Sequence, residues 1–414
     1  MQKITYSKFE QELNKYLKEY LADDSYDHLK ERLDLPEKNK DLVSKKINEF
    51  YREQLQIDNT PSKDRIRVDR IITFSEKNLS AEKFCKLLID LGRICISEGK
   101  IDLANEIFKK ASKLTNDDLT KAESLLGLAD VLSRKAKWTK SLETIFDAKA
   151  LFKSIADYRG LAKCENLLGT IFGELGDISK AKKHLLTSLS LIKSDEDLEL
   201  AANLYSNLGI VYLIQESPEA SISHLNRALT LYNKLGNQKS TSEVSLNIGI
   251  VHYESDNFDA AMVALDSAIE VAKTGGFLSV LCLTYLAKAQ VLIKLNNFSY
   301  ADEFANKALE ISHNSDDKLT LADIYKVKGI IARDLENFAA SETYLLNSLR
   351  INNSLNNELN VAETSFELGL LYEKMKDAES RNIYLKRSQN YFKNIEANAK
   401  VDMIEEMLGF STAL

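Results

Sequence analysis

The feature that most constrains the fold is a segment that recurs along the chain at a fixed spacing. "YSNLGIVYLIQESPEASISHLNRAL", residues 205–229, is followed 40 residues later by the near copy "SLNIGIVHYESDNFDAAMVALDSAI". Aligned on one small residue, eight such segments have the anchors Gly92, Ala129, Gly169, Gly209, Gly249, Ala289, Gly329 and Gly369. The first spacing is 37 residues and every later one is 40. A constant period of this length predicts an array of stacked repeats rather than one globular core.

Each repeat has the pattern of two helices that pack closely. The residues 12 and 19 positions after the anchors are almost always Ala or Ser, and those 16 positions after are large and apolar in seven repeats, with Ala305 as the exception. Small residues let two helices approach, and large ones fill the remaining space. Short segments such as "EGKID", "LGDIS" and "SDNFD" separate the two helices. Only 3 Pro and 15 Gly in 414 residues also favour long helices.

The second helix of several repeats ends at a residue that tolerates a left-handed backbone. Gly236, Gly276, Asp316 and Asn356 each lie 27 positions after an anchor. Gly, Asn and Asp adopt this conformation more readily than other residues do. Ala156 and Glu196 occupy the same position in other repeats, so we expect those two turns to close differently.

This pattern resembles the tetratricopeptide repeat over about residues 80–396. "NLGIVY" and "ELGLLY" match its Leu-Gly-x-x-Tyr motif. The resemblance implies an all-α fold, in which about eight helix pairs stack into a right-handed superhelical solenoid. The 40-residue period is similar to that of kinesin light chains, Leu-Gly-Asn-type adaptors and Rap-type bacterial regulators.

The repeats divide the chain into three predicted parts, which are an N-terminal helical segment (1–79), the array (80–396) and a C-terminal capping helix (397–414). In the first part, helices are expected over 9–21, 41–55 and 63–74. This segment either caps the open apolar end of the first repeat, which is the favoured interpretation, or forms a separate module that binds a second partner. At the other end, Val401, Ile404, Met407 and Leu408 give the last helix one apolar face.

In the family that the sequence resembles, the first helices line a concave groove. The groove positions are six, three and two before each anchor, and one, four and five after it. Asn207 and Asn247 are expected to bond the backbone of a bound peptide, since an amide both donates and accepts. The apolar candidates are Ile210, Leu213, Leu246, Ile250, Tyr253, Leu286, Ile293 and Ile330. The implied ligand is an extended or amphipathic segment of a partner protein.

Departures from the family's residue pattern restrict the class of ligand that the groove is expected to bind. The chaperone-binding version clamps a carboxylate with Lys, Arg and Asn, whereas Glu243 stands here where a Lys is expected. Binding of an acidic chaperone tail through repeats three to five is therefore rejected. Apolar residues one after the anchor also argue against the acidic ligands of the adaptors. The alternative is that the apolar positions pack permanently on another helix, on the chain's own N-terminal segment, or on a second copy in a self-associated form.

Composition excludes several classes of function. The net charge of −7, and a basic run at 63–70 that is interleaved with Asp64 and Asp69, disfavour nucleic-acid binding. No apolar run is long enough for a membrane span, and the first residues lack the apolar core of a signal peptide. Cys85, Cys95, Cys164 and Cys282 show no CxxC spacing and are expected to be buried free thiols of a cytoplasmic protein.

No catalytic motif is found in the sequence, and the five His residues are scattered. We therefore predict a non-enzymatic scaffold or adaptor that uses no cofactor or metal. The alternative is a peptide-responsive regulator of the Rap type, in which a peptide bound by the array changes what the N-terminal helices bind. An enzyme is the third possibility, and no residue pattern supports it.

Overall fold

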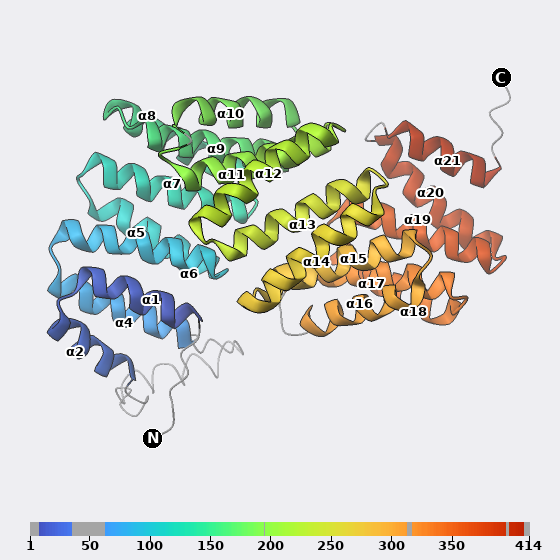
Figure 1. Ribbon diagram of the computed structural model, residues 1–414, viewed down its shortest axis with the longest axis horizontal. Helices are drawn as coiled ribbons and strands as arrows, with labels where there is room; N and C mark the ends of the chain where they lie inside the picture. The colour runs from blue at the N-terminus through green and yellow to red at the C-terminus, as the bar shows by residue number, and fades with distance from the viewer. Residues whose placement is uncertain (1–7, 35–62, 194, 313–316, 395–396, 410–414) are drawn as a thin grey trace, which may run out of the picture. The chain divides into compact units, whose positions relative to one another are not determined.

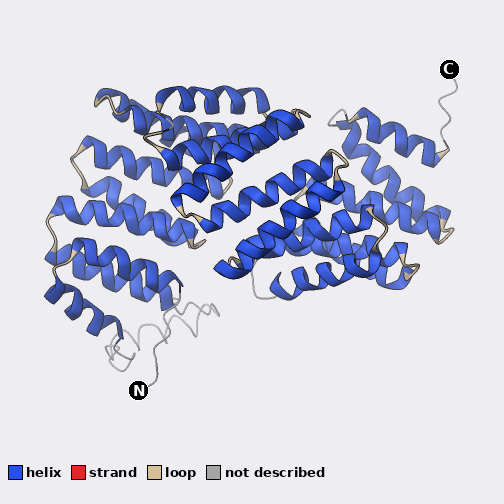
Figure 2. Cartoon of the chain, in the orientation of Figure 1, coloured by secondary structure: helices blue, strands red, loops and turns tan. Residues whose placement is uncertain are grey.

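The computed structural model describes residues 8–34, 63–193, 195–312, 317–394 and 397–409. These residues form twenty helices. Figures 1 and 2 show the helices in chain order, with no strand among the described residues. The chain divides into two compact units, an N-terminal unit (1–196) and a C-terminal unit (197–414), and each is described by itself. The all-α prediction is confirmed, and the predicted helix over 41–55 lies outside the described residues.

The N-terminal unit contains three leading helices and three repeats. The leading helices are α1 (Lys8–Tyr20), α2 (Asp23–Asp34) and α4 (Lys63–Asn78). The helix pairs are α5 (Ala81–Ser97) with α6 (Ile101–Leu114), α7 (Asp118–Arg134) with α8 (Trp138–Ser154), and α9 (Tyr158–Glu174) with α10 (Ile178–Leu191). Sequence analysis did not predict α2.

The C-terminal unit contains five repeats and a final helix. Its helix pairs are α11 (Leu198–Ile214) with α12 (Pro218–Leu235), α13 (Gln238–Glu254) with α14 (Phe258–Gly275), α15 (Leu278–Lys294) with α16 (Phe298–Ser312), α17 (Lys318–Asp334) with α18 (Phe338–Ser354), and α19 (Glu358–Lys374) with α20 (Ala378–Asn394). The chain then forms α21 (Asn398–Leu408), whose Val401 and Ile404 share an apolar cluster with Phe392.

The anchor residues allow close packing within each pair. In six repeats the anchor is Gly, and a Cβ atom on Gly249 would lie 2.7 Å from the Leu265 side chain 16 positions later. In repeat six, the anchor is Ala289 and the residue 16 positions later is the small Ala305. The larger anchor is therefore matched by a smaller facing side chain. The prediction of small residues at helix contacts is confirmed. A further bond ties the pair where a Ser lies 12 positions after the anchor, since Ser221 Oγ donates to the Gly209 carbonyl at 2.7 Å.

The turn inside each repeat has the same backbone conformation in all eight repeats. The residue seven positions after the anchor has a positive φ in all eight repeats: Gly99, Ala136, Gly176, Glu216, Asp256, Asn296, Glu336 and Lys376. Four of these are neither Gly, Asn nor Asp, so in those repeats the tertiary structure imposes a conformation that costs an L-residue about 1–2 kcal/mol. In those four repeats the local sequence alone does not encode the turn.

The ends of the second helices agree with expectation in part. Gly236, Gly276 and Asn356 have positive φ as predicted, and Asp316 lies outside the described residues. The expectation that Ala156 closes differently is wrong, because its φ is 54° and it has the same left-handed conformation. The expectation for Glu196 is confirmed, because α10 ends early at Leu191 and Glu196, which lies among the described residues, does not have a positive φ.

The leading helices of the N-terminal unit pack on the first repeat. Phe9, Leu13, Leu17 and Leu21 are buried in one apolar cluster together with residues of α4 and α5. The helix predicted over 9–21 is thus confirmed, and these four residues recur at helical spacing on one face of it. Tyr20 Oη donates to Asp90 Oδ2 at 2.6 Å, which fixes α1 against a groove position of α5.

Candidate peptide-binding cavity

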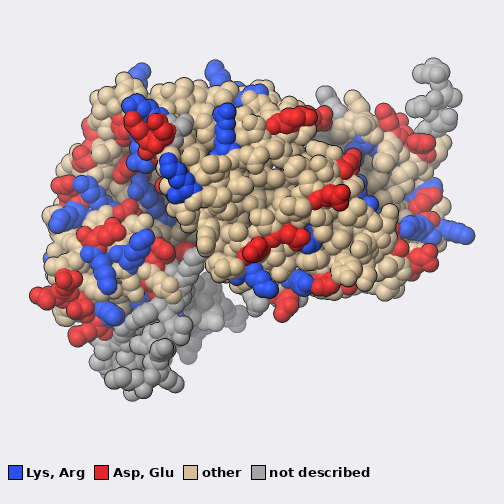
Figure 3. Space-filling view, in the orientation of Figure 1, with Lys and Arg blue, Asp and Glu red and all other residues tan. Residues whose placement is uncertain are grey.

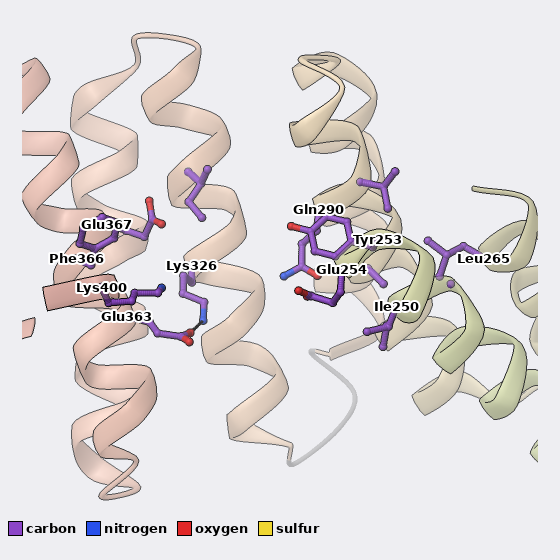
Figure 4. A pocket seen from close by; sticks show the side chains of 14 residues that line it. Ile250, Tyr253, Glu254, Leu265, Gln290, Lys326, Glu363, Phe366, Glu367 and Lys400 are labelled. Carbon is purple, nitrogen blue, oxygen red and sulfur yellow. Dashed lines mark hydrogen bonds and ion pairs between the residues drawn. The ribbon is translucent and has the colours of Figure 1, made fainter. Parts of the chain in front are cut away.

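A cavity of about 470 Å³ lies within the C-terminal unit, among the groove positions of the first helices. Figure 4 shows its two walls, one from α13, α14 and α15, and the other from α17, α19 and α21. The lining residues are Gly249, Ile250, Tyr253, Glu254, Leu265, Ala287, Gln290, Val291, Lys326, Ile330, Glu363, Phe366, Glu367 and Lys400. The helical period brings them together, because each first helix turns the same positions toward the cavity.

The apolar part of the cavity comes from both walls. Ile250 and Tyr253 of α13 and Phe366 of α19 line the cavity in Figure 4. Ile330 of α17 lines it as well. Phe366 is buried, and the other three are half-buried. Burial also raises the pKa of Tyr253 above its usual value. The four side chains form a surface on which apolar residues of a ligand can be removed from water.

The wall formed by α17 and α19 is charged but internally neutralised. Lys326 Nζ lies 2.7 Å from Glu363 Oε2 and 3.6 Å from Asp323 Oδ1. Burial alone would lower the pKa of Lys326, but these two carboxylates raise it above its usual value. Glu367 is paired with Arg333 at 2.5 Å. The acidic groups of this wall therefore already have cations, and they bind α17 to α19.

Lys400 comes from the final helix α21. Its Nζ lies 5.7 Å from the ring centre of Phe366 and 5.2 Å from that of Phe392, within the range of cation–π contacts. The side chain lines the cavity in Figure 4. The last helix thus contributes a cation to a site that the repeats otherwise build.

The opposite wall carries polar groups without partners. Glu254 is exposed, and no described residue forms an ion pair or hydrogen bond with it. On the same face of α13, the half-buried amide of Asn247 and carboxylate of Glu243 likewise lack such a partner within the described part of the chain. Desolvation raises the pKa of Glu243, and only the nearby Lys239 lowers it. These groups are available to a ligand.

The residues predicted for the groove have different surroundings. Ile250, Tyr253 and Ile330 are brought together in the cavity. Leu246 and Leu286 are each only 7% exposed and belong to the apolar core. The remaining candidates do not line the cavity: Asn207, Ile210, Leu213, Asn247 and Ile293. Of these, Ile210 is 40% exposed and the others are half-buried.

Sequence reasoning missed most of the charged lining. Glu254, Lys326, Glu363 and Glu367 all occupy groove positions, so the repeat register could have found them. They were left out because the interpretation followed apolar and amide residues only. Lys400 follows the array and has no repeat signal.

Other buried polar groups have a structural role within the fold. In the N-terminal unit, the buried Glu165 lies 2.5 Å from Lys149 Nζ and 2.6 Å from His184 Nδ1, and His184 stacks on Phe172. Burial raises the pKa of the Cys95 and Cys164 thiols to about 12, so both are far from the reactive thiolate form. Among the described residues, no three His, Cys, Asp or Glu side chains are grouped as metal ligands.

The surface charge and the length of the helices concern two further classes of partner, nucleic acids and membranes. On the face drawn in Figure 3, basic side chains are interspersed with acidic ones. No helix in the described ranges is long and apolar enough to cross a bilayer. The prediction that nucleic acid is not a ligand stays a prediction.

Comparisons with known proteins agree with the repeat pattern. The sequence profile of the tetratricopeptide repeat matches residues 200–274, which span α11 to α14. No curated protein matches the sequence. Apo RapI is similar in structure at 16% identity and a TM-score of 0.55, over 68% of this chain and 99% of RapI.

The quorum sensor NprR gives two further matches. Its apo form from B. thuringiensis has 15% identity and a TM-score of 0.59, over 84% of this chain and 98% of that one. NprR in complex with its cognate peptide NprX has 13% identity and a TM-score of 0.55, over 78% and 98%. At these identities the matches show the fold, which is a tetratricopeptide-repeat array resembling those of Rap-type proteins.

Proposed function

We propose that this tetratricopeptide repeat protein binds an extended or amphipathic segment of a partner protein in the cavity of its C-terminal unit. The observation that carries the proposal is the cavity itself, which is lined by the apolar side chains of Ile250, Tyr253 and Ile330 and by Glu254, a carboxylate that pairs with no residue in the described part of the chain. Apolar contact would supply affinity, and the polar groups would fix the orientation of the segment. The protein would act as a non-enzymatic adaptor.

The polar groups of α13 fit a peptide backbone. The Asn247 amide can donate to a peptide carbonyl and accept from a peptide N–H, so it would hold the main chain whatever the side chains are. Asn207 occupies the same position in the preceding repeat. The complex of NprR with NprX supports the proposal, because a protein of similar fold binds a peptide.

A second candidate function is a peptide-responsive regulator, in which the N-terminal helices bind another partner. The observation in its favour is that α1, α2 and α4 precede the repeats and bury an apolar cluster of their own with α5. Both candidates fit a cytoplasmic protein, since four buried free thiols suit a reducing compartment.

The test begins with selection of peptides from a random phage-displayed library on the full chain. Binding of a selected peptide, labelled with fluorescein, is then measured by anisotropy. Ile330→Asp places a charge on the apolar surface and is expected to weaken binding at least about tenfold, which corresponds to 1.4 kcal/mol. Val263→Asp is the matched control, because Val263 is 73% exposed on α14 and lies outside the cavity. Failure to select any peptide, or equal affinity for the Ile330→Asp variant, contradicts the proposal.

The paired substitution Asn207→Ala/Asn247→Ala tests the backbone contacts. It should weaken the same peptide without unfolding the array, because the groove rather than the core loses hydrogen bonds. Limited proteolysis between residues 59 and 64, with and without peptide, separates the two functions. Cleavage that the peptide leaves unchanged argues against the regulator.

A further inference from the structure

One face of α13 presents an alternation of acidic, amide and apolar groups. Glu243, Asn247, Ile250 and Glu254 follow one another at spacings of four, three and four residues. Such spacings keep side chains on one face of a helix. The two carboxylates are eleven residues apart, which is three turns, or about 16 Å along the axis. Ile250 and Glu254 line the cavity, so this face leads directly into it.

These carboxylates differ from the other acidic groups around the cavity. Glu363 and Glu367 are neutralised by Lys326 and Arg333. By contrast, neither Glu243 nor Glu254 forms an ion pair or hydrogen bond with any residue that the structure describes. Glu243 is half-buried, and a part-buried carboxylate without a partner is costly, so folded proteins generally pair such groups. Glu254 is exposed, so this cost applies to Glu243 alone.

Nearby cations do not cancel this charge. Lys294 occupies the same repeat position in α15 as Glu254 does in α13, yet no ion pair joins them within the described residues. Lys400, on the opposite wall, lies against the rings of Phe366 and Phe392. Lys239 is one turn before Glu243, where it lowers the pKa of that carboxyl less than burial raises it.

We infer that the segment bound in the cavity carries two basic groups, Lys or Arg side chains or an amino terminus, which pair with Glu254 and Glu243. An apolar residue between them lies on Ile250 and Tyr253, and Asn247 holds the intervening peptide group. This inference rests on the proposed function, and it names the chemistry of the ligand. An extended chain rises about 3.3 Å per residue, so the two basic groups are about five residues apart. The charge also excludes acidic segments, which the two carboxylates repel.

The test compares peptides selected by three forms of the full chain from a random dodecapeptide library. These are the wild type, the Glu243→Gln/Glu254→Gln variant and the control Glu219→Gln/Glu270→Gln. The control removes two exposed carboxylates from α12 and α14, so both variants change the net charge equally. We expect peptides rich in Lys and Arg, with two basic positions about five apart, from the wild type and the control. The Glu243→Gln/Glu254→Gln variant should lose this preference.

The outcomes separate the two proposals. If no peptide is selected by any form, the proposed function fails, and this inference fails with it. If peptides are selected but show no basic preference, or the same preference with the Glu243→Gln/Glu254→Gln variant, the inference alone is overturned. A second copy of the chain as the occupant would appear as a concentration-dependent dimer that competes with peptide, and it would also overturn the inference.

Affinity measurements sharpen the test for one selected peptide. Each single Glu→Gln change should weaken binding about tenfold, the usual effect of losing a charge-assisted contact. Added NaCl should weaken the wild type more than the double variant. Glu254→Lys should bind a peptide whose matching basic residue is replaced by Glu better than the wild type does. Failure of this charge exchange, with circular dichroism unchanged, would contradict a direct pairing at Glu254.

Discussion

The two units use the same groove positions in different ways. In the N-terminal unit, Arg93 lies 3.2 Å from Asp90 and 3.3 Å from Glu123, and Arg134 lies 2.8 Å from Asp130. Tyr20 of α1 also donates to Asp90. In the C-terminal unit, Glu243 and Glu254 occupy groove positions and pair with none of the residues that the structure describes there. Groove charges of α5 and α7 thus pair with one another, as do those of α17 and α19 in the C-terminal unit, whereas the two carboxylates of α13 are left for a ligand.

This difference shows what a binding surface needs beyond its fold. Both units have the same anchors and the same turns inside each repeat. Groove charges that pair with one another stabilise neighbouring helices, but a ligand must compete with those pairs. A half-buried carboxylate that pairs with no described residue, such as Glu243, costs stability until a ligand neutralises it. Substitutions in the repeat scaffold should therefore affect both units alike, whereas substitutions of groove charges should affect the two units differently.

The largest effect is expected from the shared anchors. Gly169→Ala and Gly249→Ala would place a Cβ atom 2.6 Å from Leu185 and 2.7 Å from Leu265, respectively. Overpacking of this kind costs about 1–3 kcal/mol of unfolding free energy. Adding Leu265→Ala to Gly249→Ala should restore part of the loss relative to the sum of the single changes, since Ala289 and Ala305 coexist in repeat six. Urea denaturation of the four variants measures this coupling. A purely additive double variant would show that the anchor contact does not limit the packing.

A somewhat smaller effect is expected from the turn inside each repeat. Ala136 in the N-terminal unit and Glu336 in the C-terminal unit have φ of 52° and 61°. Gly removes the left-handed strain but adds unfolded-state entropy, so each change to Gly should stabilise its unit by up to about 1 kcal/mol. Thermal unfolding of the two variants checks the value. Gly99→Ala, at the same position with φ of 72°, is the reverse control and should destabilise by a similar amount.

Sequence analysis succeeded where one residue type decides the outcome. The anchor glycines, the small residues at helix contacts and the apolar face of α1 follow from size and period, so the helix pairs could be predicted. The turn at Ala156 could not, because packing of the two flanking helices imposes a positive φ that Ala does not prefer. Leu246 and Leu286 occupy groove positions but are buried, since their neighbours cover them. The partners of Lys326 and Arg333 lie in the next repeat, so the spacing within one repeat does not reveal this pairing of groove charges.

A third prediction contrasts one charge from each unit. Arg93→Gln in the N-terminal unit removes two exposed ion pairs, which are worth about 0–1 kcal/mol, so a small loss of stability is expected. Glu254→Gln in the C-terminal unit removes no pair and should leave stability unchanged while it weakens a bound basic peptide. Chemical denaturation and anisotropy together distinguish the two results. A stability loss in Glu254→Gln as large as in Arg93→Gln would show that Glu254 has a structural partner in solution, and the contrast between the units would then not hold.

The smallest effect is expected in the pH dependence of folding stability that Glu243 contributes. It is also the most informative test of the contrast between the two units. The folded state raises its pKa, so the folded chain holds this proton more tightly than the unfolded chain does. The contribution to stability is fully present below about pH 4, near the usual pKa of Glu, and is lost as the pH rises through the folded pKa. Glu243→Gln should therefore be more stable than the wild type at pH 7 and should lose this advantage near pH 4. The titratable groups that interact with this carboxyl are Lys239 and the phenol of Tyr232, and the phenol is neutral at both pH values because its pKa is raised above the usual value. Thermal unfolding at both pH values measures the difference. A variant that is less stable at pH 7 would mean that the carboxylate is already compensated within the fold, and a basic ligand would then have nothing to neutralise there.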